Sequence, residues 1–124
     1  ATAAEIVSEL VTLTDLAYGD KIAFHTGGSA KTLSTTSGVY AAIDVTAATN
    51  LLEAANLAAA GGTNDTGDTE INWFVYGGNT YILFDEDAAT GTDVDDGDAL
   101  VLVVGVHDFT NSTLTTAGVF EYSA

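Results

Sequence analysis

The sequence predicts an α+β domain that is mostly β: an antiparallel, sandwich-like sheet with one or two short helices. Two dense runs of β-branched and aromatic residues, Ile71–Tyr76 and Thr80–Phe84, are separated by Gly77-Gly78-Asn79. Glycine and asparagine accept the positive φ of tight hairpin turns, so these runs predict a hairpin. A third apolar run, Ala99–Val106, follows an acidic loop. The spacing of turn-like stretches along the chain predicts about five to seven strands.

The length and composition indicate a single folded domain. A chain of 124 residues that is 47% hydrophobic can bury a core without disulfide or metal cross-links, and we do not expect it to be disordered. There is no Cys, which excludes disulfides and thiolate chemistry. We expect one domain over residues 1–124, with an N-terminal segment at 1–16 and a candidate assembly strand at 117–124.

The N-terminal segment favours a short amphipathic helix over Ala3–Val11. Thr2 and Glu5 have the spacing of a capping box, and apolar residues recur at helical spacing after them. A strand is the alternative, because Val7, Val11 and Leu13 also suit one face of a sheet.

The next elements alternate between strands and one clear helix. Lys21–His25 and Val39–Val45 are predicted strands, and Lys31–Thr35 is a weak edge strand in which Lys31 discourages aggregation. Thr46–Ala60 is the predicted helix, rich in Ala and Leu, with Gly61 as its C-terminal cap. Its expected buried face is Leu51, Leu52, Ala55 and Ala59, and its polar stripe is Asn50, Glu53 and Asn56.

After the hairpin and the third apolar run, Thr110–Thr116 is a turn-like connection and Val119–Tyr122 a last short strand. Such a terminal strand can pair within its own sheet or add itself to a neighbouring copy. Both alternatives stay open at this point. In the hairpin, Trp73, Phe74 and Tyr76 are expected to pack in the core and against neighbouring strands, and not to form an aromatic surface that binds carbohydrate.

The charge balance is extreme. Eighteen acidic residues face two basic ones, Lys21 and Lys31, which gives a formal net charge of −16. Phosphate backbones and anionic membranes repel such a chain, so we expect no nucleic-acid partner and no membrane insertion. The carboxylates serve either as a solvated surface or as ligands for divalent cations.

The loop between the second and third apolar runs is the best candidate for a cation site. Calcium takes six to eight oxygen ligands, and the glycines of this loop let its carboxylates converge. The spacing is not that of an EF-hand, and an acidic solvated loop is the alternative. The candidate ligands are Asp85, Asp87, Asp93, Asp95 and Asp98.

No catalytic motif accompanies this loop. His25 and His107 have no second His or Cys at ligand spacing, so each is expected to be a hydrogen-bonded structural residue. A nucleophile elbow and phosphate-binding glycine loops are absent from the sequence. Glu70 beside Trp73 is the one hint of glycoside hydrolysis. We therefore expect a protein that is not an enzyme, with a small carbohydrate-acting enzyme as a distant alternative.

Four phrases follow one another in the sequence: Asp20-Lys-Ile-Ala-Phe24, Leu57-Ala-Ala-Ala-Gly61, Ile71-Asn-Trp-Phe-Val-Tyr-Gly-Gly-Asn-Thr-Tyr-Ile82 and Val103-Val-Gly-Val-His-Asp-Phe109. In their order and wording, from about Asp20 onward, the chain resembles the C-terminal region of secreted bacterial RTX-type and surface-layer-type proteins. That resemblance implies export without a cleaved N-terminal signal, calcium binding outside the cell, and self-assembly or anchoring at the cell surface. The calcium-binding G-G-x-G-x-D repeats of such proteins are absent here, so that site is not carried over.

These observations predict an extracellular, non-enzymatic structural protein that self-assembles into a filament or surface layer, with calcium as the expected cofactor. Its expected partners are copies of itself. The alternative is an export or anchoring module of a larger RTX-type adhesin or secreted hydrolase.

Overall fold

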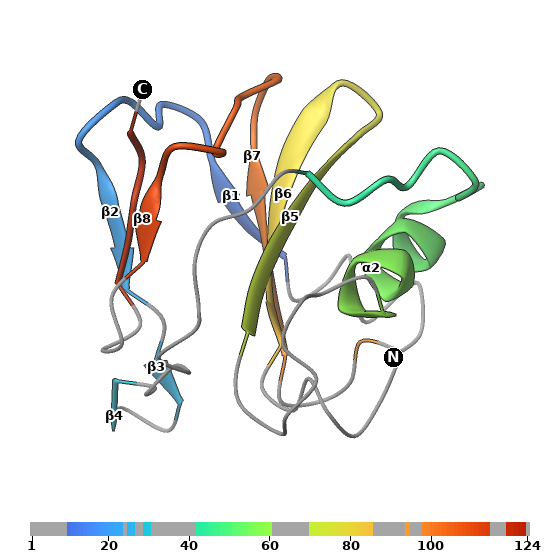
Figure 1. The fold of residues 1–124 in the computed structure, drawn as a ribbon, viewed down its shortest axis with the longest axis horizontal. Helices are drawn as coiled ribbons and strands as arrows, with labels where there is room; N and C mark the ends of the chain where they lie inside the picture. The colour runs from blue at the N-terminus through green and yellow to red at the C-terminus, as the bar shows by residue number, and fades with distance from the viewer. Residues whose placement is uncertain are drawn as a thin grey trace.

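The fold is a three-layered arrangement built on a central sheet. In a computed structural model, the described residues are 10–23, 25–26, 29–30, 42–60, 70–85, 94, 98–114 and 119–123. Within them, helix α2 covers one face of a four-stranded sheet, and a three-stranded sheet covers the other face (Figure 1). The predicted class, mostly β with a short helix, is confirmed.

The central sheet has the strand order β1-β7-β6-β5. The predicted hairpin is present as β5 (Glu70–Tyr76) and β6 (Asn79–Asp85), with Ile71 opposite Phe84. Gly77 and Gly78 both have positive φ, +59° and +83°, which is what a two-residue hairpin turn between right-twisted strands requires. The third apolar run supplies β7 (Ala99–Val103), antiparallel to β6.

The inner strands are apolar on both faces, because both faces are covered. Alternate side chains of a strand point to opposite faces, so each strand contributes to two cores. Phe74 and Leu83 belong to the core beneath α2, whereas Trp73 and Ile82 belong to the core between the two sheets. The buried members of the inter-sheet core are Ile71, Trp73, Ile82, Phe84, Val101, Val103, Phe109, Phe120 and Tyr122.

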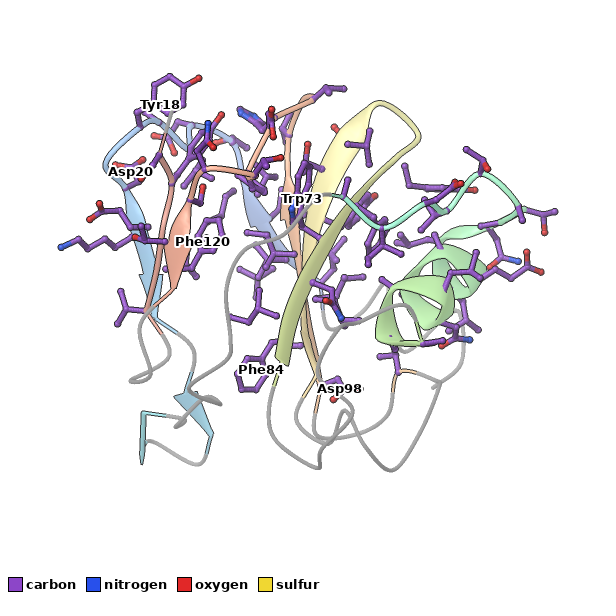
Figure 2. All side chains as sticks on the ribbon, viewed as in Figure 1. Tyr18, Asp20, Trp73, Phe84, Asp98 and Phe120 are labelled. Atoms are coloured by element: carbon purple, nitrogen blue, oxygen red, sulfur yellow. The ribbon has the colours of Figure 1, made fainter. Side chains whose placement is uncertain are left out.

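Phe109 is the centre of the core between the sheets. It is fully buried, and its ring makes edge-to-face contacts with Trp73, Phe120 and Tyr122 at centroid distances of 5.4, 5.2 and 4.9 Å. Such edge-to-face pairs add to the stabilisation that comes from burial alone. Figure 2 shows Trp73 and Phe120 in the layer between the sheets, and their burial confirms Trp73 as a packing residue.

Helix α2 (Leu51–Ala60) begins five residues later than predicted. Asn50 caps it, because its Oδ1 accepts the backbone N–H of Glu53 at 2.9 Å. The Glu53 carboxylate in turn accepts the backbone N–H and the hydroxyl of Thr49. The signal for this start is Asn50-x-x-Glu53, a capping-box spacing that a count of helix-forming residues overlooks.

The helix packs through alanines. Ala54, Ala55, Ala58 and Ala59 are buried, whereas Leu51 and Leu52, two of the four predicted to be buried, are half-buried. Small side chains let the helix axis approach the sheet, where Phe74 and Tyr81 stack at 5.2 Å. The buried Asn72 side chain donates to the carbonyl of Ala58 at 3.0 Å and ties β5 to the helix.

The second sheet has the order β2-β9-β8, formed by Lys21–Ala23, Val119–Glu121 and Thr113–Leu114. The C-terminal strand β9 is therefore the middle strand of its own chain's sheet, with Ile22 and Leu114 both opposite Phe120. Of the two alternatives for this strand, the structure has the intramolecular pairing. The segment predicted as a turn, Thr110–Thr116, contains β8.

The N-terminal prediction is corrected where the structure describes it. Residues 1–9 of the expected helix lie outside the described residues, but Val11 begins a strand, β1 (Val11–Leu13). This strand pairs with β7 in parallel, not antiparallel, and Val11 lies opposite Val101. The strand alternative is thus correct for Val11 and Leu13, because the backbone of β7 is available for hydrogen bonding with theirs.

Two further strand predictions differ in part. The predicted Lys21–His25 is divided between β2 and β3 (His25–Thr26), and β3 pairs with β4 (Ser29–Ala30). Within Val39–Val45, residues 42–45 form no strand, although the backbone N–H of Ile43 donates to the Trp73 carbonyl at 2.9 Å. Lys31–Thr35 lies outside the described residues.

Truncating the core side of the hairpin tests this packing. Phe74→Ala should lower the free energy of unfolding by about 3–5 kcal/mol, since a fully buried ring is lost and a cavity remains. Trp73→Ala should cost a similar amount from the opposite face. Urea denaturation measures both, with Val106→Ala, which removes an exposed side chain, as the control. Near-neutral results at both rings would contradict the two-sided core.

Candidate functional site

The predicted cation site lies where β6 ends and β7 begins. Three of its five residues, Asp87, Asp93 and Asp95, fall outside the described residues. Asp85 is the last residue of β6, and Asp98 directly precedes β7. Because Phe84 pairs with Ala99, positions 85 and 98 are the next pair of this antiparallel register.

The register adds a third acidic residue to this corner. Glu70 is the partner of Asp85, and Asp98 directly precedes Ala99 of β7, so positions 70, 85 and 98 lie next to one another at this end of the sheet. The pairing of Glu70 with Asp85 follows from the two-residue turn at Gly77-Gly78 that the structure shows. Figure 2 shows Asp98 near Phe84 at this end of the sheet, far from Tyr18 and Asp20 at the opposite end.

At this corner the structure describes the side chain of Asp98 but only the backbone of Glu70 and Asp85. Within the part of the chain that the structure describes, no three His, Cys, Asp or Glu side chains are grouped to hold a metal ion. Asp98 is half-buried and already interacts with other groups. The calcium prediction therefore depends on loop residues outside the described ranges, and it stays a prediction.

Other described carboxylates hold turns and caps. Asp44 accepts the backbone N–H and the hydroxyl of Thr46, and Asp108 does the same for Thr110. Hydrogen bonds to a carboxylate favour its charged form, so they lower the pKa of both Asp44 and Asp108. These groups are kept ionised, which suits a structural role and not that of a proton donor.

His107 is a structural histidine, as expected. Its Nε2 lies 2.9 Å from the carbonyl oxygen of Val104, which can only accept, so Nε2 carries the proton. Its Nδ1 then accepts from the Tyr122 hydroxyl at 3.2 Å. Burial raises the pKa of Tyr122, which keeps that hydroxyl protonated. For His25, only the backbone is described.

A polar network holds the turn after β7 in place. The buried Thr80 hydroxyl donates to the carbonyl of Gly105 and accepts the backbone N–H of His107, at 2.9 and 2.8 Å. The Asn79 side chain accepts the backbone N–H of Gly105. Gly105 has a φ of +90°, which a side chain would strain. Val104 and Val106 are therefore presented to solvent on a fixed turn.

Most of the exposed large apolar side chains of the described residues lie on β1 or on turns next to it. The exposed large apolar residues of the described chain are Val11, Tyr18, Leu57, Val104 and Val106. All but Leu57 lie on β1 or the two turns beside it, and the backbone N–H of Val104 donates to the Leu13 carbonyl at 3.0 Å. Val106 and Tyr18 are 68% and 65% exposed, far more than core-forming residues. Gathered exposed apolar residues mark interaction surfaces.

A groove of about 420 Å³ is lined by residues of β1, of β2, of the segment that joins them and of β7. Its apolar lining comes from Val11, Leu13, Leu16, Ile22 and Val101. Its polar lining comes from Asp15, Asp20 and Lys21. Neither the groove nor the β1 edge was predicted from the sequence, because their residues come from separate segments of the chain.

The four outer strands of the two sheets differ in how they are protected. Strand β2 carries Lys21, which pairs with Glu121 at 3.4 Å, and β8 is only two residues long. Strand β5 has the Ile43 segment hydrogen-bonded beside it. Around β1, residues 10–14 carry no charge, and β7 is its one hydrogen-bonded neighbour among the described strands. Strand β1 is three residues long, one more than β8, and unlike β2 and β5 it has neither a charged side chain nor a described segment on its outer flank.

Comparison with known proteins adds no identification: no protein family and no curated protein matches this sequence. No helix within the described ranges is long and apolar enough to cross a membrane. The candidate site therefore rests on geometry alone, and it comprises the β1 edge, the adjoining groove and the exposed apolar residues beside them.

The helix cap has a testable pH dependence. Hydrogen bonds from Thr49 lower the pKa of Glu53 below its ordinary 4.5. A lowered pKa stabilises the fold above pH 4.5, and this contribution is lost as the pH falls through the folded value. Glu53→Gln should therefore lower the melting temperature more at pH 7 than at pH 3. An equal decrease at both pH values would show that the charge is not responsible.

Proposed function

We propose that this protein is a secreted, non-enzymatic structural subunit that assembles with copies of itself into an extracellular filament or surface layer. The observation that carries the proposal is the gathering of exposed apolar residues around the unprotected β1 edge. An edge of this kind is a ready template for strand addition by another chain. The proposed function therefore depends on association between copies of the chain and not on catalysis.

The backbone of β1 is oriented for such a contact. The Leu13 carbonyl accepts from Val104, so the polar backbone groups of Leu13 face β7. Successive residues of a strand direct these groups to opposite sides, so those of Thr12 face the open side. The Thr12 side chain is exposed as well. A strand from another copy can hydrogen-bond there without displacing any described strand.

The net charge explains why we propose calcium as the assembly cofactor. Two copies of a chain with charge −16 repel one another, and cations that screen or bridge carboxylates reduce that repulsion. The acidic corner at positions 70, 85 and 98, together with the adjoining loop, is where we propose that calcium binds. Calcium outside the cell would then couple export to assembly.

Blocking the edge tests the assembly surface. Thr12→Lys places a solvated charge on β1 and should abolish sedimenting polymers in calcium, because a buried ammonium costs more than the strand contact provides. Thr113→Lys makes the same change on the exposed position of β8 and should leave assembly unchanged. Sedimentation and electron microscopy measure both. A wild-type chain that stays monomeric in calcium and in chelator would instead favour the export or anchoring module.

Calcium binding has a separate thermodynamic test. If the acidic loop binds the ion, calcium should raise the melting temperature in a concentration-dependent way, since a ligand stabilises the state that binds it. The double substitution Asp93→Asn with Asp95→Asn should remove that increase. A melting temperature that is the same in calcium and in chelator would exclude this cofactor.

A further inference from the structure

We propose that Asn111 is a glycosylation site, at which a transferase attaches a sugar from a glycosyl diphosphate donor to the side-chain amide nitrogen. The site is the motif Asn111-Ser112-Thr113, an Asn-x-Thr sequence in which x is not proline. Such a motif is an acceptor when it lies on an exposed loop of an exported protein. The inference rests on the export that the proposed function includes, and not on self-assembly.

Asn111 lies in a tight turn that is anchored at both ends. The backbone N–H of Ser112 donates to the carbonyl of Phe109 at 2.9 Å, which closes a four-residue β-turn with Asn111 as its third residue. Phe109 and Ser112 are both buried, and the Ser112 hydroxyl accepts the backbone N–H of Ser123 at 3.1 Å. The turn therefore holds Asn111 at the surface, just before β8.

The two functional residues of the motif face outward together. Along Asn111, Ser112 and Thr113, the side chains are exposed, buried and exposed in turn. This alternation is typical of an extended chain, in which residues i and i+2 share one face. The amide of Asn111 and the hydroxyl of Thr113 are thus presented on the same side, where a transferase can bind both.

Among the described asparagines, Asn111 is the one without a structural role. Each of the others hydrogen-bonds a backbone group of the fold through its side chain: Asn50, Asn56, Asn72 and Asn79. The Asn111 side chain is exposed and makes no such bond to the residues that the structure describes. A sugar can therefore be attached to it without the loss of a contact that holds those residues together.

The reaction is a substitution at the anomeric carbon of the donor. The amide nitrogen of Asn111 forms a bond to that carbon, the bond from the carbon to the diphosphate oxygen breaks, and the diphosphate leaves with the electron pair. The nitrogen loses one of its two protons to a base of the transferase, so no oxidant or reductant is needed. The carrier of the diphosphate is a nucleotide or a lipid, and the chemistry at Asn111 is the same for both.

A glycan at this position also affects the second sheet. Strand β8 is an outer strand in the order β2-β9-β8, and it begins two residues after Asn111. Glycans are bulky and hydrated. One at the start of an outer strand hinders pairing of that strand with another chain, and so adds to the protection that β8 has from its shortness.

Transfer to the purified, folded full chain tests the site. One arm uses a soluble N-glycosyltransferase with a nucleotide-diphosphate hexose, and the other uses a membrane oligosaccharyltransferase with a lipid-diphosphate oligosaccharide. Another Asn-x-Thr motif begins at Asn64, outside the described residues, so every chain carries Asn64→Gln. In one arm or both, the intact mass should rise by one glycan per chain. Asn111→Gln and Thr113→Val should each abolish this increase, and Thr113→Ser should retain it.

Folding is controlled by the same variants. Asn111→Gln should leave the melting temperature unchanged, because the side chain holds no described group, and Thr113→Val keeps the β-branched shape at the start of β8. No transfer in either arm, or transfer that persists in Asn111→Gln, would overturn the inference.

The protein collected from outside its own cells provides the second measurement. Peptide mass spectrometry should find the glycan on Asn111, and an unmodified Asn111 there would overturn the inference while leaving self-assembly intact. A glycosylated chain that never polymerises would overturn the proposed assembly alone. A chain found only inside the cell would overturn the export on which both proposals depend.

Discussion

The structure depends on the burial of β6 and β7 on both of their faces. These strands carry apolar side chains at nearly every position, so neither face of the sheet can be left in water. One face is covered by α2 and the other by the β2-β9-β8 sheet. This requirement explains why the helix is lined with alanine and why the C-terminal strand is held inside the molecule.

Covering both faces leaves the strand edges as the surfaces where the backbone can meet another chain. Strands β2, β8 and β5 are protected by charge, by shortness or by a neighbouring segment, whereas the three-residue β1 has no charge and no described segment on its outer flank. Its neighbouring turns also hold Tyr18, Val104 and Val106 in water. Among the described strands, this difference is the reason why we propose β1 as the place of contact between copies.

The charge of the chain acts at two different ranges. At short range, described carboxylates such as Asp44, Glu53 and Asp108 accept hydrogen bonds from nearby backbone and so define turns and a helix cap. At long range, the net charge of −16 opposes contact between copies. The carboxylates that hold turns and the helix cap need no cation for that role. We propose a role for calcium only in the association of copies.

By itself, the sequence determined those features that depend on neighbouring residues. The hairpin follows from Gly77-Gly78-Asn79 between two apolar runs, whereas its register, with Glu70 opposite Asp85, was fixed only when the structure placed Asn79 in β6. The body of α2 and the burial of Trp73 and Phe74 were also predictable, because periodicity and bulk are local properties. The start of α2 at Leu51 was encoded locally in Asn50 and Glu53, but helix-forming composition obscured it.

Only the tertiary structure decided which distant segments pair. The sequence favoured a helix over Ala3–Val11, with a strand through Val11 and Leu13 as the alternative, and pairing with β7 made Val11–Leu13 a parallel strand. Val119–Glu121 could have left the molecule, but Ile22 and Leu114 pair with it on both sides. The β1 groove likewise unites Val11, Ile22 and Val101, which no local pattern connects. Which strands pair depends on how much apolar surface the whole chain buries. A local sequence pattern does not determine that total.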